Sequence, residues 1–327
     1  EPIVRQLSEF ALIATYFKGL TGQQGVELGI GDDAALVKVS PGHHLVCATD
    51  TLVESVHFPV GASAEQIATR TLCVNLSDMA AMGATPKWFT LALTIPQDMA
   101  NADWLEGFSR GLAKIANQFN VALVGGDTTA GPLTISLTLM GEVPIGDALR
   151  RDGAAVEDAI YVTGTLGDGA ASLNMIKGHS KQINSPDRLL KRFYEPQPQV
   201  EIGIKLRNIA SACIDISDGL IADLGHICQA SRVCGQIETN LLPVHGELVE
   251  TWPQHFLGWA LTGGDDYQLC FTVPLVHRET VDQWIAKGKL QATLIGQILA
   301  ANNSDDLVIV DGQSSTAFNG GFDHFSR

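Results

Sequence analysis

The 327-residue chain is short of basic residues and has no long apolar run, and each shortage excludes a class of protein. Lys and Arg number 21 against 36 Asp and Glu, so the formal net charge is −15. Nucleic-acid binding needs clustered Lys and Arg, and an anionic membrane surface repels an acidic chain. No uncharged stretch approaches the roughly 20 apolar residues that span a bilayer, and no signal segment opens the chain. We therefore expect no nucleic-acid partner and no membrane association.

The chain also lacks paired cysteines and the familiar nucleotide motifs. Its six cysteines form no CxxC pair, and most lie in apolar runs, which argues against a zinc site or a disulfide framework and favours reduced thiols in the cytoplasm. There is no GxxxxGK[ST] and no HRDxxxxN, so a P-loop enzyme and a protein kinase are excluded. The segment 29–34 imitates a GxGxxA fingerprint, but two aspartates would then face a pyrophosphate without a metal.

What the chain does have is ordinary globular material for two domains. Hydrophobic residues make up 45% and charged residues 17% of the sequence. A domain usually has roughly 100–200 residues, so two are expected. Pro144-Ile145-Gly146-Asp147 interrupts the preceding strand pattern, and we place the boundary there, giving domains 1–145 and 146–327.

Hydrophobic periodicity predicts alternating helices and strands. Asn101 is a plausible N-cap, and Ser217 is expected to cap the helix that follows it. Residues Thr134–Val143 and Tyr267–Val273 alternate between apolar and polar, which favours half-buried strands in a mixed or antiparallel sheet. Further expected helices are Ser8–Lys18 and Gln66–Met82, and further expected strands are His44–Val53, Trp88–Ile95, Val121–Val124, Ala159–Thr163, Ala212–Ile216 and Leu307–Val310, the last followed by hairpin chemistry at Asp311-Gly312.

Acidic residues recur beside glycines, mostly near the predicted strand ends. A single Gly-Asp pair is most often a turn, but several at strand ends occupy the positions where α/β proteins bind ligands. A further acid, Asp78, shares a polar stripe with Thr71 and Asn75 in an apolar helix, where a buried carboxylate needs a partner or a metal. The five acidic elements are Gly31-Asp32-Asp33, Thr49-Asp50, Gly126-Asp127, Asp215–Gly219 and Gly264-Asp265-Asp266.

Carboxylates that converge must be compensated, and Mg²⁺ prefers oxygen ligands and substrate phosphates. Ser217 at a helix start would offer backbone N–H groups to an anion. Arg151 could pair with a phosphate or be a surface arginine, and a lone His57 is more often structural than a ligand. The residues therefore predict Mg²⁺ ions that bind a polyphosphate and are held by Asp33, Asp50, Asp78, Asp127 and Asp215.

Seven segments in order carry a resemblance to a known family. They are Glu27–Ala35, Thr49–Val53 with His57-Phe58, Asn75–Gly83, Gly125–Thr129, Asp215–Leu220, Gly263–Tyr267 and Gly321–Phe325. Together they resemble the motifs of the thiamine-monophosphate kinase family, over nearly the whole chain. The Asn-x-x-Asp and Gly-Gly-Asp elements alone would indicate only its superfamily, which includes aminoimidazole ribonucleotide synthetase.

The resemblance implies an α+β fold of two domains, the aminoimidazole ribonucleotide synthetase-like fold, with mixed and antiparallel sheets flanked by helices. It implies that ATP phosphorylates thiamine monophosphate to thiamine diphosphate with several Mg²⁺ ions; K⁺ is a further candidate cofactor. The N-terminal domain would carry the metal and nucleotide site and form a barrel-like core with a second copy, making a homodimer. The C-terminal domain would close the nucleotide site.

The resemblance also implies residue roles. It assigns metal ligands to Asp33, Thr49, Asp50, Asp78, Asp127, Asp215 and Asp218, of which Asp50, Asp78 and Asp127 would be catalytic. It assigns nucleotide contacts to Gly126, Asp127, Arg151 and Ser217, and acceptor contacts to His57, Asp265 and Phe322. The chain departs from the family at Ala48, where Ser is frequent, and at Asp265, where Glu is usual and would reach further.

Two alternatives stay open. One is another ATP-dependent enzyme of the superfamily, which would form an acyl- or seleno-phosphate. The other is a non-catalytic module that binds divalent cations without ATP turnover. A phosphate acceptor is already ionised near neutral pH and needs no general base, so the expected mechanism is direct in-line transfer aided by positioning and charge neutralisation.

Overall fold

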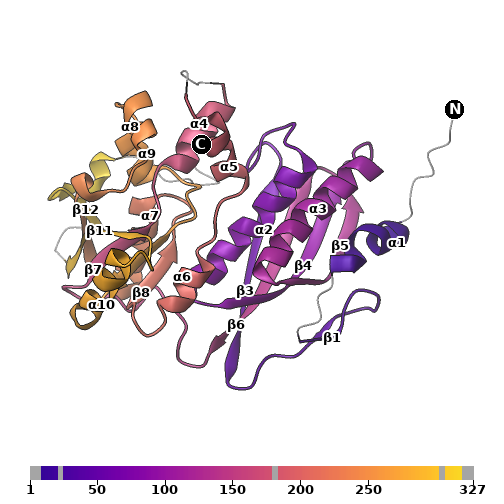
Figure 1. Cartoon of the computed structure of the whole chain (residues 1–327), viewed down its shortest axis with the longest axis horizontal. Helices are drawn as coiled ribbons and strands as arrows, with labels where there is room; N and C mark the ends of the chain where they lie inside the picture. Colours follow the sequence, from indigo (N-terminus) through magenta and orange to yellow (C-terminus); the bar gives the residue numbers. More distant parts are fainter. Residues whose placement is uncertain (1–8, 21–24, 179–182, 302–305, 319–327) are drawn as a thin grey trace. The chain divides into compact units, whose positions relative to one another are not determined.

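The structure is a computed structural model that describes residues 9–20, 25–178, 183–301 and 306–318. Two compact units make up the chain (Figure 1). Unit 1 consists of Glu1–Met79 and Thr85–Ile145, and unit 2 consists of Ala80–Ala84 and Gly146–Arg327. The short segment Ala80–Ala84 thus belongs to unit 2.

Unit 1 is built on a four-stranded mixed sheet in the order β3-β6-β4-β5. Strands β4 and β5 are parallel and the other neighbours are antiparallel, as the half-buried pattern predicted. A separate small pair of strands, β1 (Val26–Leu28) and β2 (Leu36–Val37), precedes it. The four strands are β3 (His43–Val53), β4 (Thr85–Ile95), β5 (Ala122–Ala130) and β6 (Thr134–Pro144).

Two helices, α2 (Ala64–Ala81) and α3 (Ala102–Phe119), cover one face of this sheet (Figure 1). Every second residue of β6 points to them: Ile135, Leu137 and Leu139 are fully buried. Asn101 caps α3 as predicted, because its side chain accepts the Trp104 N–H at 3.0 Å. A short α1 (Glu9–Leu12) continues into a π turn (Ile13–Phe17) and a 3₁₀ turn (Lys18–Leu20), where the sequence predicted one regular helix.

The opposite face of the sheet, here called the outer face, is more exposed and carries hydroxyl groups. Thr49 and Thr51 of β3 are exposed on it, and their hydroxyls bond to Thr138 and Ser136 of β6, each at 2.8 Å. Its end near Trp88 is covered by residues of β1 and β2 that pack on it. The outer face is therefore a partly uncovered sheet surface.

Strand β5 is longer than predicted. The sequence placed its end at Val124, but the strand continues to Ala130 and pairs with β4 across a bulge at Val124, directly before the two glycines. In the sequence, Gly125 and Gly126 suggest the end of a strand. In the structure, Gly126 lets the backbone of β5 pack closely against β4. The Gly126-Asp127 element therefore lies inside a strand and not in a loop.

Unit 2 contains a seven-stranded sheet in the order β13-β12-β9-β11-β7-β10-β8. All neighbours are antiparallel except β12 and β9. The strands are β7 (Ala159–Thr163), β8 (Ala212–Asp215), β9 (Val233–Ile237), β10 (Leu269–Val273), β11 (Ala292–Ala300), β12 (Val308–Val310) and β13 (Gln313–Ser314). The predicted hairpin at Asp311-Gly312 is confirmed, because Val310 pairs with Gln313.

Helices lie on both faces of the larger sheet. Leu224 of α7 and Leu261 of α9 share a core with Ile160 of β7, whereas the neighbouring Tyr161 donates its hydroxyl to Asp282 of α10. Strand β10 is consequently buried at every residue, and the prediction of a half-buried alternating strand there is wrong. The helices are α4 (Asp168–Ile176), α5 (Pro186–Tyr194), α6 (Val200–Lys205), α7 (Leu220–Ser231), α8 (Gly246–Thr251), α9 (Phe256–Thr262) and α10 (Leu275–Ala286), with 3₁₀ turns at Thr239–Leu241 and Ser315–Ala317.

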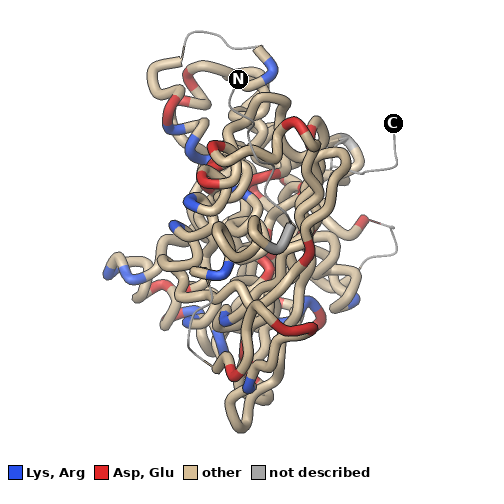
Figure 2. The backbone as a smooth tube through the Cα atoms, turned by 90° about the vertical axis from the view of Figure 1, so that its right-hand side faces the viewer, with Lys and Arg blue, Asp and Glu red and all other residues tan. Residues whose placement is uncertain are grey.

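Acidic residues are spread along the chain, in line with its acidic composition. Figure 2 shows red acidic positions recurring at many separate points along the backbone, with blue basic positions between them. Within the described residues, every helix is too short or too polar to cross a bilayer. All six cysteines are free thiols, and five of them are buried.

Candidate active site

In unit 1 the structure brings Asp50 and Asp78 to the same side of the sheet. Asp50 pairs with Leu137 and so shares its helix-covered face. Its backbone N–H donates to Asn75 Oδ1 at 3.3 Å, and Asp78 follows Asn75 by one turn of α2. Thr71 and Asn75 are fully buried and Asp78 is half-buried, so two of the three members of the polar stripe of α2 do not face solvent.

Burial leaves the Asp50 carboxylate in need of compensation. Desolvation raises the pKa of Asp50 above its ordinary value. No hydrogen bond or ion pair from the described residues reaches this carboxylate; only its backbone is bonded to Asn75. An oxygen donor of this kind fits a hard divalent cation, which would supply the missing positive charge.

Thr49 and Asp127 lie on the other side of the sheet. The pairing places Asp127 beside Ala92, and Ala92 beside Ser136, so the side chain of Asp127 is on the exposed outer face. Asp127 is exposed, and its Oδ1 accepts the Thr128 N–H at 2.9 Å. It is also on β5, at the opposite edge from β3.

The described part of unit 1 therefore does not assemble the predicted metal cluster by itself. Three interstrand steps separate β3 from β5, or about 14 Å. Within the described residues, no three His, Cys, Asp or Glu side chains form a group that could hold a metal ion. Asp33 is exposed in the turn between β1 and β2, where its N–H donates to Asp32 Oδ1 at 2.9 Å.

Gly126 occupies a position that only glycine can take. Its φ is +150°, and a Cβ built on it would lie 1.8 Å from the carbonyl oxygen of Leu91 in β4. The backbone of β5 thus lies directly against β4 at the residue that precedes Asp127. This close approach fixes the path of the strand that carries Asp127.

His57 is held in a tight loop after β3. Its Nδ1 accepts the Val53 N–H at 2.9 Å, so a neutral ring carries its proton on Nε2. The buried Arg70 of α2 donates from Nε to the His57 carbonyl at 3.1 Å. These two hydrogen bonds therefore fix the orientation and the tautomer of His57, which is predicted to contact the acceptor.

In unit 2 the loop between β8 and α7 collects Asp215, Ser217 and Asp218. The prediction that Ser217 caps the helix is wrong, because α7 begins at Leu220 after Gly219. The backbone N–H groups of residues 217, 218 and 219 are also not free for an anion. All three donate to Asp223 Oδ2, at 3.0, 3.0 and 3.1 Å.

Asp223 concentrates negative charge in this loop. The pKa of Asp223 is raised to about 7, mainly by burial and also by the charges of Asp215 and Asp218, while the backbone N–H bonds oppose the rise. Asp215 itself is buried at 6% exposure. Three acids so close together in the chain make the loop a second place where a cation would be stabilised.

The Gly263–Tyr267 turn lies directly against this loop. The Asp265 N–H donates to the Ser217 carbonyl at 2.9 Å, and the Tyr267 N–H donates to the Ile216 carbonyl at 2.8 Å. Asp215 also pairs with Leu269 at the start of β10. The structure therefore brings the predicted residues Asp215, Ser217, Asp218 and Asp265 together at one end of the larger sheet.

Two other predicted residues are not placed in this group. The carbonyl of Arg151 accepts the Ser231 hydroxyl at 2.8 Å, at the C-terminal end of α7. The 12 residues of α7, about 18 Å of helix, separate that point from the loop of Ser217. Phe322 lies outside the described residues.

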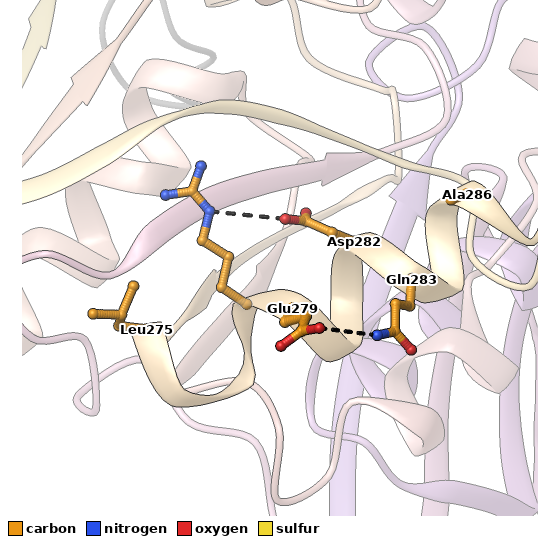
Figure 3. A pocket seen from close by; sticks show the side chains of 6 residues that line it. Leu275, Glu279, Asp282, Gln283 and Ala286 are labelled. Atoms are coloured by element: carbon orange, nitrogen blue, oxygen red, sulfur yellow. Dashed lines mark hydrogen bonds and ion pairs between the residues drawn. The ribbon is translucent and has the colours of Figure 1, made fainter.

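Two surface hollows are separate from all these residues. One follows α10, and Figure 3 shows its lining side chains on that single helix, with ion pairing between Arg278 and Asp282. The other lies between the first turns of α2 and α3, beside Trp104 and Arg110. Neither hollow contains a predicted site residue.

Comparison with known proteins then identifies the family. The AIR synthase related protein N-terminal domain matches residues 31–143, and the corresponding C-terminal domain matches residues 155–308. A thiamine-monophosphate kinase of Escherichia coli K12 is 45% identical over 97% of this chain and 98% of its own length. The chain belongs to the thiamine-monophosphate kinase family.

Solved structures agree with this assignment to the thiamine-monophosphate kinase family. A thiamine-monophosphate kinase from Stenotrophomonas maltophilia K279a is 43% identical, with a TM-score of 0.82, covering 89% of this chain and 93% of that one. AaThiL complexed with AMPPCP and TMP is 31% identical, with a TM-score of 0.78 and 98% of both chains covered. The two-domain fold of mixed sheets and flanking helices is therefore that of this kinase family.

Three residues that support the candidate site were not predicted as such from the sequence. Asn75 was noticed only as part of a stripe, although it bonds to Asp50. Asp223 could have been suspected, because an acid in the first turn of an apolar helix often accepts N–H groups nearby. Asp266 belongs to the Gly263–Tyr267 motif, but no role was predicted for it. The residues next to it in the sequence do not indicate that it is buried.

Proposed function

We propose that this chain transfers the γ-phosphoryl group of ATP to thiamine monophosphate and so makes thiamine diphosphate. Family membership supports this activity. The observation that carries it is the similarity, over 98% of both chains, to AaThiL complexed with AMPPCP, an ATP analogue, and TMP. In the reaction a phosphate oxygen of the acceptor bonds to the γ-phosphorus while the bond to the ADP oxygen breaks.

Magnesium ions would be held mainly by aspartates of this chain. The fit rests on the Asp50 carboxylate, which is partly buried without a described partner, and on the acid-rich loop around Asp215. Bound Mg²⁺ would neutralise the phosphate charges. The proposed ligands are Asp33, Thr49, Asp50, Asp78, Asp127, Asp215 and Asp218, and K⁺ is a further candidate cofactor.

The chain's own residues would bind and orient the two substrates. Gly126, Asp127, Arg151 and Ser217 are the proposed nucleotide contacts, with Ser217 acting through a group other than its occupied N–H. His57, Asp265 and Phe322 are the proposed acceptor contacts. Because the acceptor phosphate is already an anion, no residue has to remove a proton from it.

We further propose that the active form is a homodimer in the cytoplasm. The outer face of the unit 1 sheet offers a surface for a second copy, since Leu45 of β3 is 44% exposed. Because Thr49 and Asp127 both lie on this outer face, a second copy packed there would bring its own Thr49 and Asp127 close to them. The free thiols fit a reducing compartment.

The activity is tested by ATP consumption with thiamine monophosphate, against free thiamine and acceptor-free reactions. We expect turnover only with the monophosphate. Asp127→Asn should lose most turnover and stay folded, whereas Asp98→Asn, at an exposed aspartate between β4 and α3, should not. Equal turnover with all acceptors would support another superfamily reaction, and no turnover would support a cation-binding module.

The dimer is tested by light scattering coupled to gel filtration. Leu45→Lys should shift the protein towards monomer, because it places a charge on the outer face. Leu275→Lys, at a 71% exposed leucine of α10, is the matched control and should not change the mass. A monomeric wild-type protein would contradict the dimer without affecting the kinase proposal.

A further inference from the structure

Asp266 is a buried carboxylate that accepts two backbone N–H groups at the start of a helix. It is 1% exposed, and its two oxygens accept the N–H groups of Gly167 and Gly169 at 2.7 and 2.9 Å. These glycines lie at the start of the nine-residue helix α4. The side chain of Asp266 thus occupies the helix start from 99 residues beyond Gly167 and 97 residues beyond Gly169 in the sequence.

The backbone on both sides of Asp266 is in an unfavourable conformation. Asp265 has a φ of 67° and Tyr267 a φ of 50°, both in the left-handed region that favours glycine. Such conformations persist only where the surroundings impose them. Asp266 lies between these two residues, and its paired hydrogen bonds impose the turn from the α4 side.

The other side of the turn is held by the loop before α7. The Asp265 and Tyr267 N–H groups donate to the carbonyls of Ser217 and Ile216. The side chain of Asp265 is oriented as well, because its Oδ1 accepts the Tyr267 hydroxyl at 3.1 Å. The turn is therefore attached to two elements, and Asp266 provides the attachment to α4.

Packing leaves no room for the turn to move towards α4. A Cβ built on Gly169 would lie 2.5 Å from both the Asp265 carbonyl carbon and the Gly264 carbonyl oxygen. The backbone of α4 therefore touches the backbone of the turn directly. Loss of the Asp266 bonds would free the turn to move only away from α4, and Asp265 would move with it.

We propose that Asp266 is a positioning residue for the acceptor: it binds the start of α4 so that the Gly263–Tyr267 turn presents Asp265 to thiamine monophosphate. The inference rests on the proposed function, in which Asp265 contacts the acceptor. A carboxylate is required because both N–H groups need an acceptor oxygen. An amide offers one oxygen, and its NH₂ group would face the second N–H.

The test compares Asp266→Asn with Asp158→Asn. Asp158 is the matched control, because it is also buried in unit 2, at 3% exposure, and accepts the Ala155 N–H at 2.9 Å. Steady-state kinetics are measured with thiamine monophosphate and ATP varied separately. Asp266→Asn should raise KM for the acceptor about tenfold and leave KM for ATP within about twofold. Asp158→Asn should lower Tm without changing either KM.

Hydrogen exchange measures the attachment directly. The amides of Gly167 and Gly169 should exchange faster in Asp266→Asn than in the wild-type protein. If that variant does not fold, the wild-type protein still tests the idea: thiamine monophosphate should slow exchange at these two amides, and ATP alone should not. An acceptor that leaves both amides unchanged would overturn the proposal.

Kinetics give two further ways to overturn it. A wild-type acceptor KM in Asp266→Asn, or an equal rise in both KM values, would show that Asp266 is only structural. An unchanged acceptor KM in Asp265→Ala, with turnover still specific for the monophosphate, would refute the role of Asp265 and this inference while leaving the kinase activity standing. Absence of any acceptor-dependent turnover in the wild-type protein would refute both.

Discussion

Replacement of Gly126 by alanine should destabilise unit 1 far more than its single methyl group suggests. The added Cβ would lie 1.8 Å from the Leu91 carbonyl oxygen, which belongs to the backbone and cannot rotate away. The φ of +150° is unfavourable for alanine in addition. Strand β5 must therefore move away from β4, and their main-chain hydrogen bonds near Gly126 must weaken.

The magnitude follows from these two effects. Backbone strain of this kind costs about 1–3 kcal/mol, and each backbone hydrogen bond that is lost costs about 1 kcal/mol net. We expect Gly126→Ala to lower the free energy of unfolding by about 2–5 kcal/mol, a large part of the 5–15 kcal/mol or so that stabilises a typical domain. Turnover should fall too, because Asp127 is the next residue.

The neighbouring Gly125 provides the control. Its φ is not positive, and a Cβ built there would meet only Thr90 Cγ2, at 3.9 Å. Gly125→Ala should therefore change stability by no more than about 1 kcal/mol. Urea unfolding followed by tryptophan fluorescence measures both variants, and hydrogen exchange reports whether β5 amides lose protection. If Gly126→Ala were as stable as Gly125→Ala within about 0.5 kcal/mol, the close approach of β4 and β5 would be wrong.

Three further outcomes are expected. Asn101→Ala removes the cap of α3 and should cost about 1 kcal/mol in thermal unfolding, whereas Asn117→Ala, exposed in the same helix, should not. Asp50→Asn should reduce turnover about 100-fold or more and yet raise Tm in metal-free buffer, because it removes a poorly solvated charge; an unchanged rate would exclude Asp50 from the site. The pKa of Asp266 is raised from 3.8 to about 7, mainly by burial, while the N–H bonds from Gly169 and Gly167 oppose the rise. The folded state therefore binds this proton more tightly, and its contribution to stability falls as pH rises from about 4 to about 7, by at most about 1.4 kcal/mol per pH unit. Urea unfolding across this range should show a flatter pH dependence for Asp266→Asn, and an unchanged slope would contradict the raised pKa.

Local sequence patterns were sufficient to predict features whose physical cause lies in residues close together in the chain. Asn101 caps α3 because a short polar side chain before an amphipathic run accepts an N–H of the first turn. The pair Asp311-Gly312 turns a hairpin because both residues adopt positive φ, at 49° and 78°. The alternation along β6 follows from a sheet with helices on one face only. Family membership, likewise, could be recognised from the motifs in their order.

Only the tertiary structure determined which residues far apart in the chain contact one another. The sequence ended a strand at Val124, since glycines usually end strands, but Gly126 is there to let β5 approach β4. It made Ser217 a helix cap, whereas Asp223 takes the N–H groups of that loop. It could not show that Asp50 and Asp127 occupy opposite faces, because facing depends on sheet order and register, and these are set by contacts between residues far apart in the chain.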